Sequence, residues 1–509
     1  MNDKICIVGG GIAGLYSALC LLDNGFTNIC IYEATNRLGG HIYTHYDKTF
    51  QFETGGIRFN KSHTRLINLL DRFGLHKVEL PKEKQFIRLL CNKRVVSEDL
   101  SESFIKKVIQ ASKKYSKEEL FNMTFGQLCD QILGLHNSHL TISSFGYNAE
   151  FHVANAYNSI EIFKRDFVNN TTYYACVEGL SELVNRIEKE LESKGVKIYK
   201  NSGLQDLSYQ RSKFKLIFQN KEIIKCNRVI LAIPKGSLIH LNFFTEEQKQ
   251  LLNSVSGIPL HRIFGQFSKP WFKNIIRTTT DIPLRHFIPI DYKQGIAQIS
   301  YTDLYDADYW KYHSDQGLDI LEKQLHSQLE LIFPKHKIPP LQWLLSYYWK
   351  EGVHVWNVGY DADIIRKSLQ LIHPKLSIVG ESYSSHHGWI EGALESVDTM
   401  LSLKGGMHTY KHWIASLSKI TLKNLEDAKQ KYPEFKWVLL KLKEDKNHRV
   451  VDVTEWMNFH PGGVTPFTDH MYQDITKYFN SIGFHYDQGN LKNHVFENVK
   501  KYTLGYIKI

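Results

Sequence analysis

The sequence predicts an α/β protein of more than one domain, in which a discontinuous parallel-sheet domain carries an inserted α+β domain and a small α+β unit follows. Residues 4–32 read as strand, glycine-rich turn, helix and strand, and a strand followed by a helix returns from Leu376 to about Leu403. Gly405-Gly406 then interrupts that helix, and the residues from about Leu417 onward have a pattern of their own. A chain of 509 residues is also too long for one hydrophobic core.

Composition places the chain among soluble globular proteins. Hydrophobic residues make up 42% and charged residues 23%, which excludes the disordered, collagen-like and coiled-coil classes. No apolar run approaches the roughly 18 to 20 residues that a membrane-spanning helix needs. An apolar strand begins by Ile5, which leaves no room for a cleavable signal segment. The net charge of +10 is spread along the chain, so we interpret it as a solvated surface rather than a nucleic-acid or membrane surface.

Cysteine usage indicates a reducing environment. The seven cysteines form no C-x-x-C pair and have no zinc-ligand spacing. Cys6, Cys20 and Cys30 fall in apolar elements, where a reduced thiol behaves as a small hydrophobic group. We therefore predict a thiol-reducing, cytoplasmic location rather than a secreted disulfide framework.

The first element is a glycine-rich loop between a strand and a helix, with Gly9, Gly11 and Gly14 in the pattern G-x-G-x-x-G. The first glycine makes a tight turn, the second lets the backbone approach a pyrophosphate, and the third permits close packing of helix on strand. Ala13 lies in the first helical turn, whose N–H groups favour a phosphate. Glu33 stands 19 residues after Gly14, where a carboxylate accepts hydrogen bonds from an adenosine ribose. These features predict a Rossmann-like dinucleotide-binding domain; the alternative is a plain glycine turn beside an exposed glutamate.

The residues after this loop indicate which dinucleotide binds. The stretch Glu33-Ala-Thr-Asn-Arg37-Leu-Gly39-Gly40-His41 resembles the E-x-x-x-R-x-G-G-R segment of the flavin-containing amine oxidase superfamily. The resemblance implies that FAD is bound, that Arg37 braces its pyrophosphate, and that Gly40 lets the backbone approach it. The second arginine of the family is His41 in this chain.

The next motif concerns the substrate. Residues 53–59 and 62–75 look most like the L-amino acid oxidase branch of that superfamily. In that branch the arginine at the position of Arg58 grips the substrate carboxylate, which a planar guanidinium fits better than an ammonium group does. The alternative is a structural salt bridge on the cofactor side. The resemblance also places Gly56, Ile57 and Arg58 beside the cofactor.

Two later segments continue the resemblance. Residues 201–204 stand where the family clasps the adenine with an aliphatic side chain, which assigns Leu204 to that contact. Residues 229–234 match the family's strand with its terminal proline.

A third segment resembles the closing cofactor motif of the superfamily. It consists of Gly380-Glu381 and, shortly after, Trp389 and Ile390 at the start of a helix. The resemblance implies that Glu381 accepts hydrogen bonds from ribityl hydroxyls and that the helix start near Ile390 points N–H groups at the flavin pyrimidine. Trp389 would form one wall of an aromatic cage in front of the flavin; ordinary core packing is the alternative.

These motifs divide the chain into predicted domains. We assign residues 1–60, 173–240 and 370–404 to a discontinuous FAD-binding domain and residues 61–172 and 241–369 to a substrate-binding domain. A linker at 405–416 and a C-terminal domain at 417–509 follow.

The resemblance also implies the chemistry. These flavoproteins move a hydride from the C–H beside a neutral amine to flavin N5, and the imine then hydrolyses. Many members hold a lysine against N5 through a water, and Arg262 stands at that position. An arginine keeps its proton, so Arg262 can hold a water but cannot act as a base; the alternative is a surface-strand residue. We assign the second cage wall to Trp356, with Tyr360 or His354 as alternatives.

Two features of the family are missing from this chain. No cysteine follows Cys226, so the FAD is expected to be non-covalent. The L-amino acid oxidase branch uses a tyrosine as a second carboxylate ligand, but residues 286–290 contain none and Tyr292 is only nearby.

The C-terminal region has its own motif. The sequence Asn-Phe-His460-Pro-Gly-Gly resembles the haem-binding segment of cytochrome b5. The resemblance implies haem b with His460 and His485 as axial ligands of the iron, and His470 or His494 as alternatives to the second. Phe479 is expected to pack against the haem. A domain that has lost its haem is the competing interpretation.

Together these features predict an enzyme in which FAD oxidises an amine or amino acid and the electrons pass to O2 or through the fused haem. One alternative is a desaturase or isomerase that uses the same flavin fold on a lipid-like substrate. Another is a redox carrier or binding module that does not turn over. The expected partners are a small-molecule amine or amino acid and O2 or a redox protein, with no nucleic acid and no membrane span.

Overall fold

The computed structural model contains two compact units, Met1–Asp398 and Thr399–Ile509. No helix in the part of the chain that the structure describes is long and apolar enough to cross a membrane. The predicted linker at 405–416 lies outside the described residues. The described residues are 3–402, apart from 91, 92, 98, 169 and 170, together with 436–443, 445–453, 472–482, 485–487, 490–492, 495, 499–500 and 503–507.

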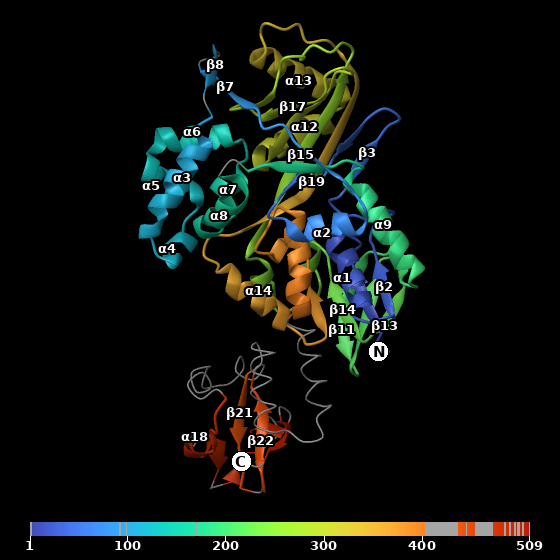
Figure 1. The fold of residues 1–509 in the computed structure, drawn as a ribbon, viewed down its shortest axis with the longest axis vertical. Helices are drawn as coiled ribbons and strands as arrows, with labels where there is room; N and C mark the ends of the chain where they lie inside the picture. The colour runs from blue at the N-terminus through green and yellow to red at the C-terminus, as the bar shows by residue number, and fades with distance from the viewer. Residues whose placement is uncertain are drawn as a thin grey trace. The chain divides into compact units, whose positions relative to one another are not determined.

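A five-stranded parallel sheet carries the glycine-rich loop, in the order β10-β2-β1-β14-β20. Its strands β2 and β14 are labelled in Figure 1. Ile5 lies opposite Ile29 on one side and Arg228 on the other. The two N-terminal strands are buried along their whole length, as expected for a parallel sheet covered on both faces. The strands are β1 (Ile5–Val8), β2 (Ile29–Tyr32), β10 (Lys197–Tyr199), β14 (Arg228–Leu231) and β20 (Leu376–Ile378). The predicted α/β fold is confirmed.

Two layers cover this sheet. Helices α1 (Ile12–Asp23) and α9 (Leu180–Ser193) pack against each other on one side. On the other, a three-stranded antiparallel sheet shares one hydrophobic core with the parallel strands. Its strands are β11 (Leu204–Gln210), β12 (Lys213–Phe218) and β13 (Ile223–Cys226).

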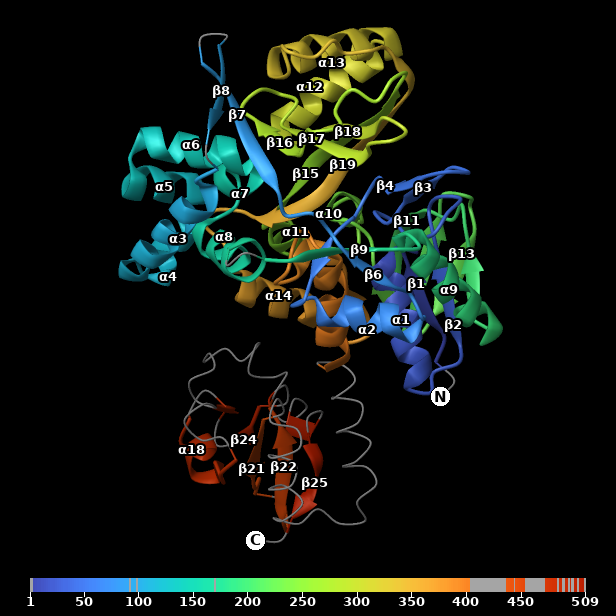
Figure 2. The ribbon, with the colours of Figure 1, turned by 45° about the horizontal axis from the view of Figure 1, so that its top comes forward.

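A second, seven-stranded sheet runs in the order β19-β15-β18-β17-β16-β7-β8 (Figure 2). Helices α12 (Leu304–Asp315) and α13 (Leu318–Ile332) bury its apolar side chains in a separate core. The strands are β7 (Lys84–Leu90), β8 (Lys93–Ser97), β15 (Val255–Phe267), β16 (Arg277–Thr280), β17 (His286–Asp291), β18 (Ile296–Asp303) and β19 (Leu341–Trp356).

A helical lobe with its own core lies beside this sheet in both views. Its last turn, Phe163–Phe167, is a π-helix that continues directly from α8. The helices are α3 (Ser101–Ala111), η1 (Ser112–Lys114), α4 (Lys117–Phe121), α5 (Phe125–Leu133), α6 (Leu135–Phe145), α7 (Ala149–His152) and α8 (Ala156–Ile162).

Short strands link the lobe and the parallel sheet. The three-stranded sheet β5-β9-β6 pairs Phe59 with Tyr174, which sets Arg58 near Tyr173. These short strands are β3 (Thr44–Tyr46), β4 (Gln51–Glu53), β5 (Phe59–Asn60), β6 (Lys77–Glu79) and β9 (Tyr173–Cys176). Further helices of the first unit are α2 (Thr64–Arg72), α10 (Lys235–Leu238), α11 (Glu246–Leu252), α14 (Ala362–Leu371) and η3 (Glu381–Tyr383). The boundaries assigned to the FAD-binding and substrate-binding domains stay a prediction.

The second unit contains a three-stranded antiparallel sheet in the order β21-β22-β25. A small core formed by the sheet and α18 includes Val438, Val451 and Phe479. The elements are β21 (Trp437–Leu440), β22 (His448–Asp452), α18 (Thr476–Ser481), β23 (Tyr486–Asp487), β24 (Asn490–Leu491) and β25 (Thr503–Ile507).

Candidate functional site

The glycine-rich loop has the geometry that a pyrophosphate needs. Any Cβ on Gly14 would lie 2.0 Å from the Gly9 carbonyl oxygen, so α1 packs against the loop at a distance that only glycine permits. Gly11 is the N-cap of α1, no side chain caps that end, and no acidic residue lies in its first turn, where Ala13 is buried. Gly40 lies beside Gly11 at this helix start, where a Cβ on Gly40 would come 3.2 Å from the Gly11 Cα. The uncapped backbone N–H groups at the start of α1 therefore fit an anionic cofactor group.

Glu33 is fixed at the carboxyl end of β2. Its Oε2 accepts a hydrogen bond from the Gly10 N–H at 2.7 Å, and its Oε1 accepts the N–H and Oγ1–H of Thr35, both at 2.8 Å. The backbone N–H of Ser202 donates to the Glu33 carbonyl, which brings the start of β11, and Leu204 with it, to the same edge of the sheet. The predicted ribose and adenine contacts therefore lie side by side.

Arg37 holds the turn that follows. It donates to the carbonyls of Gly40 at 2.7 Å and of Leu38 and Ile42 at 3.2 Å, and its guanidinium lies 4.8 Å from the Tyr43 ring centroid. These hydrogen bonds from Arg37 hold the loop that carries Gly40. Direct contact between Arg37 and a pyrophosphate stays a prediction.

The closing motif brings distant segments together. Gly380 donates its N–H to Ser396 Oγ, and Glu381 accepts hydrogen bonds from the Gly388 N–H and from the N–H and Nδ1 of His354. Burial alone would raise the pKa of Glu381, but His354 and these backbone donors hold that pKa below its usual range. The pairing of His354 with Glu381 was not predicted from the sequence, in which His354 was only an alternative cage residue.

Ile390 begins the helix that spans residues 390–402. A Cβ on Gly56 would meet the Ile390 side chain at 3.2 Å, so the motif of residues 53–59 packs directly on the closing motif. The partly buried Ile57 lies between Gly56 and Arg58 in that segment. The structure therefore brings together the residues that the resemblance assigned to the flavin end of the cofactor.

Trp389 and Tyr173 form two parallel aromatic faces. Their ring centroids lie 6.2 Å apart with an interplanar angle of 7°, and Phe167 completes the group at 5.9 Å from Trp389. The guanidinium of Arg58 lies 4.4 Å from the Tyr173 centroid and 5.8 Å from that of Trp389. Among the described residues, no carboxylate lies within ion-pair distance of Arg58. Because Arg58 has no carboxylate partner there, the prediction that it binds a substrate anion is favoured over the alternative of a structural salt bridge.

The assignment of Trp356 to the cage is wrong. Its side chain has no exposed surface, belongs to the hydrophobic core of the parallel sheet, and donates its Nε1–H to the Ser384 carbonyl at 3.1 Å. It lies at the last position of β19, and that strand end points into the core. Tyr173, on β9, is the residue that faces Trp389.

Arg262 lies inside the molecule on β15, so the surface-strand alternative is wrong. The residue is 4% exposed, and its guanidinium donates to the Glu53 carbonyl at 3.1 Å and lies 4.1 Å from the Tyr301 ring centroid. The side chain of Glu53 is buried, and this burial raises its pKa to about 6 despite hydrogen bonds from Leu180 and Thr44. Contact between Arg262 and the flavin stays a prediction.

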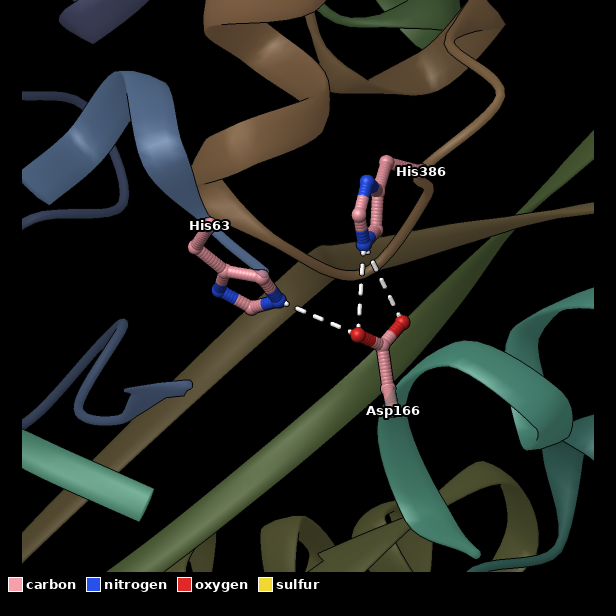
Figure 3. Close-up of side chains that lie close together, drawn as sticks. All are labelled: His63, Asp166 and His386. Carbon is pink, nitrogen blue, oxygen red and sulfur yellow. Dashed lines mark hydrogen bonds and ion pairs between the residues drawn. The ribbon is translucent and has the colours of Figure 1, made fainter. Parts of the chain in front are cut away.

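Next to Trp389 lies a buried cluster of His63, Asp166 and His386. Figure 3 shows the three side chains of this cluster. Both imidazole Nε2 atoms lie 3.1 Å from Asp166 carboxylate oxygens, and Asn60 and Arg165 also donate to this carboxylate. Burial would raise the pKa of Asp166, but the two histidines hold it well below its usual range. The His63 ring meets the Trp389 ring edge-on at 4.7 Å.

This cluster was not predicted from the sequence. The three residues are 103 and 220 positions apart, and none belongs to a metal-ligand spacing. With four donors, the Asp166 carboxylate is hydrogen-bonded on all sides, so we interpret the cluster as the support that holds the Trp389 wall in place. Tyr173 donates its hydroxyl to the Asp166 carbonyl, so both aromatic faces are tied to the same π-helical turn.

In the second unit, His485 is buried and its Nδ1 lies 3.2 Å from the Phe479 carbonyl oxygen. Such a bond favours the tautomer with its lone pair on Nε2, which is the form that binds a metal. The Phe479 ring lies 4.3 Å from the imidazole. His460, His470 and His494 lie outside the described residues.

Two family models match the chain. Residues 12–397 match the flavin-containing amine oxidoreductases, and residues 446–508 match the cytochrome b5-like heme/steroid-binding domain. The second match includes the predicted ligands His460 and His485.

Individual proteins are also similar to this chain in sequence. Achacin from Lissachatina fulica is 22% identical over 495 residues, which cover 78% of this chain and 92% of achacin. A tryptophan 2-monooxygenase from Allorhizobium ampelinum is 40% identical over 78 residues, which cover 15% of this chain and only 11% of that enzyme. An L-amino-acid oxidase from Neurospora crassa is 44% identical over 64 residues, which cover 11% of this chain and 9% of that oxidase.

A solved structure confirms the fold. A putrescine oxidase double mutant superposes with a TM-score of 0.63 at 15% identity, covering 79% of this chain and 99% of that one. At that identity the match establishes a shared fold and nothing finer.

Proposed function

The chain belongs to the flavin-containing amine oxidoreductase family, and from that premise we propose that it oxidises an amino acid at its amine-bearing carbon. FAD is the cofactor that the family assignment indicates, and haem is the one indicated for the cytochrome b5-like domain. FAD supplies the acceptor for the hydride that leaves Cα, and water then converts the imine to a keto acid and ammonia.

One observation carries the amino-acid assignment. Arg58 presents a guanidinium between aromatic faces without a carboxylate partner among the described residues. A bidentate contact with a substrate carboxylate would satisfy it. The similarity to the L-amino-acid oxidase from Neurospora crassa supports the same substrate class.

The remaining site residues position the substrate. Trp389 and Tyr173 offer parallel faces that keep water from the reacting carbon, and the His63–Asp166–His386 cluster holds Trp389. Arg262 keeps its proton and can orient a water, so we assign it no role as a base.

The test is anaerobic mixing of the holoenzyme with a panel of amino acids and the corresponding decarboxylated amines. We expect flavin absorbance to bleach with at least one amino acid and more slowly with its amine. Bleaching with amines alone would overturn the amino-acid assignment. No bleaching with either class would favour the desaturase or isomerase alternative or a carrier that does not turn over.

The electron acceptor is a separate proposal. We propose that the second unit accepts the electrons of the first, one at a time, because a haem with two histidine ligands has no open position for other chemistry. A covalent tether raises the concentration of one unit near the other to about the millimolar range. O2 is the alternative acceptor, and peroxide release would reveal it.

The proposed location is a reducing, cytoplasmic compartment. The six described cysteines are all free thiols: Cys6, Cys20, Cys30, Cys129, Cys176 and Cys226. Burial raises the pKa of Cys20 to about 11, which keeps the thiol protonated and unreactive. The protein is treated with an oxidant and run on a non-reducing gel. Unchanged mobility of the protein would support this proposal, and a mobility shift from disulfide formation would contradict it.

A further inference from the structure

A second arginine near Arg58 also lacks a carboxylate partner among the described residues. Arg277 begins β16; its Nη2 lies 3.5 Å from the Tyr147 hydroxyl, and its buried Nε has no hydrogen-bond partner. Two other buried or half-buried arginines are paired with acids: Arg285 with Asp306 and Arg65 with Glu391. An arginine with an unsatisfied, buried N–H group is costly unless a ligand completes it.

Tyrosines connect Arg277 to the proposed substrate site. The Tyr147 ring lies 5.3 Å from the Tyr301 ring, and Tyr301 in turn lies under Arg262. Burial lowers the pKa of Arg277, and the nearby charge on Arg58 lowers it further. We call Arg58, Tyr147, Tyr173, Arg277 and Tyr301 the arginine–tyrosine cluster.

The acids near this cluster do not neutralise it. Burial and the charge of Asp303 raise the pKa of Glu150 to about 7, so Glu150 is only partly ionised at neutral pH, and its buried Oε2 has no partner. His286 adds no charge, because burial and the surrounding arginines keep its pKa well below the usual value. The cluster therefore holds two guanidinium charges and less than one full negative charge from Glu150.

Two like charges in a partly desolvated site repel each other, and a ligand with two negative groups relieves both the repulsion and the desolvation. A neutral amino acid would satisfy Arg58 and leave Arg277 uncompensated. We propose that the substrate is an amino acid with a second acidic group on its side chain, with Arg58 bound to the α-carboxylate and Arg277 to the side-chain acid. This inference rests on the proposed function and names the substrate class of the same site.

The first test compares the holoenzyme on glutamate and aspartate with glutamine and asparagine, which have the same shape without the charge. We expect kcat/KM to be about 10- to 100-fold higher for an acid than for its amide. Arg277→Gln should lower that ratio to near one, and Arg277→Lys should restore part of it. Arg94→Gln, which removes an exposed guanidinium from β8 of the same sheet, is the matched control and should keep the ratio. An enzyme that prefers the amides, or a ratio that Arg277→Gln leaves unchanged, would overturn the proposal.

The second test needs no turnover. Glutarate and its monocarboxylate counterpart, butyrate, are titrated into the holoenzyme while the flavin spectrum and the melting temperature are recorded. We expect glutarate to bind at least tenfold more tightly, and Arg277→Gln to remove the difference. If no amino acid is oxidised but glutarate binds in this way, the proposed activity fails while the dianion site stands. If neutral amino acids are oxidised and glutarate binds no better than butyrate, the activity stands and the dianion site is wrong.

Discussion

At the residue scale, Glu33 is held in place by protein groups before any ribose reaches it. The Gly10 N–H and two donors on Thr35 bind its oxygens, so one carboxylate both anchors the glycine-rich loop and presents lone pairs at the edge of the sheet. A carboxylate has about four acceptor sites, so three bonds to protein leave capacity for a ribose hydroxyl.

Replacing Glu33 with alanine should therefore weaken FAD binding. The loss of charge-assisted hydrogen bonds is worth about 1.5 to 3 kcal/mol, or roughly a 10- to 150-fold higher Kd. The Kd is measured from the fluorescence of the flavin that dissociates when the holoenzyme is diluted. Glu246→Ala removes an exposed carboxylate from α11 and is the control. A Kd equal to that of the control would show that Glu33 does not contact the cofactor.

Arg58 determines substrate choice if it binds the carboxylate. Arg58→Leu should lower kcat/KM for an amino acid about 10- to 150-fold relative to the corresponding amine, because only the amino acid loses a charged contact. Arg94→Leu serves as the control, and the readout is the ratio of the two rates. An unchanged ratio would mean that Arg58 acts on the cofactor side or only in the fold.

The flavin should be released by acid. The chain has no cysteine after Cys226 to form a thioether in the closing half of the flavin domain. Acid precipitation should leave FAD in the supernatant, where its absorbance is measured. A yellow pellet would show covalent attachment through another residue.

At the element scale, His261 ties three elements together. It lies on β15, fully buried; its Nδ1 is 3.2 Å from the Ala307 carbonyl on α12, and its Nε2 is 2.6 Å from Ser346 Oγ on β19. Burial lowers the pKa of His261 to about 4, so the folded protein keeps this imidazole neutral where the unfolded chain would protonate it. The contribution of this residue to stability is therefore complete above pH 6.5 and is lost as the pH falls toward 4.

The loss amounts to about 3 kcal/mol over that range. The His261→Gln variant lacks the titrating imidazole, so it should have a lower free energy of unfolding than the wild type at pH 7.5. The difference between the two free energies should narrow as the pH falls from 6.5 to 4. Urea unfolding at several pH values measures both free energies. Comparison with the wild type cancels the opposing effect of buried acids such as Glu53, whose raised pKa favours the folded state at lower pH. A gap that stays constant with pH would contradict the prediction.

At the scale of the whole molecule, two units with separate cores share one chain. The first unit matches the flavin-containing amine oxidoreductases, and the second matches a heme/steroid-binding domain. Under the proposed electron path, joining them would make electron transfer independent of collisions between molecules.

Anaerobic stopped-flow mixing with the substrate should bleach the flavin first and reduce the haem second, at a rate independent of protein concentration. His460→Ala should abolish the haem bands and the second phase and spare flavin bleaching, because it removes one of the two expected axial ligands. Haem that stays oxidised while the flavin is fully reduced would show that the second unit serves an outside partner.

The local patterns of the chain were enough to predict the parallel sheet and the dinucleotide loop. Residues 5–33 form a contiguous strand–loop–helix–strand unit, so the spacing of Gly9, Gly11, Gly14 and Glu33 already specifies their geometry. The return to the sheet at Leu376 was also predicted, because buried parallel strands have apolar runs that are visible in the sequence.

Other features depended on how distant segments meet in space. Trp356 was assigned to the cage from the family resemblance, but the packing of β19 turns it into the core, and Tyr173 on β9 is the ring that faces Trp389. The cluster around Asp166 draws on segments 100 or more residues apart, and so does the proposed site that joins Arg58 and Arg277. The sequence by itself determined the fold class and the cofactor motifs, because these depend on short-range backbone requirements. Only the tertiary structure decided which side chains gather around Trp389, because long-range packing sets their directions.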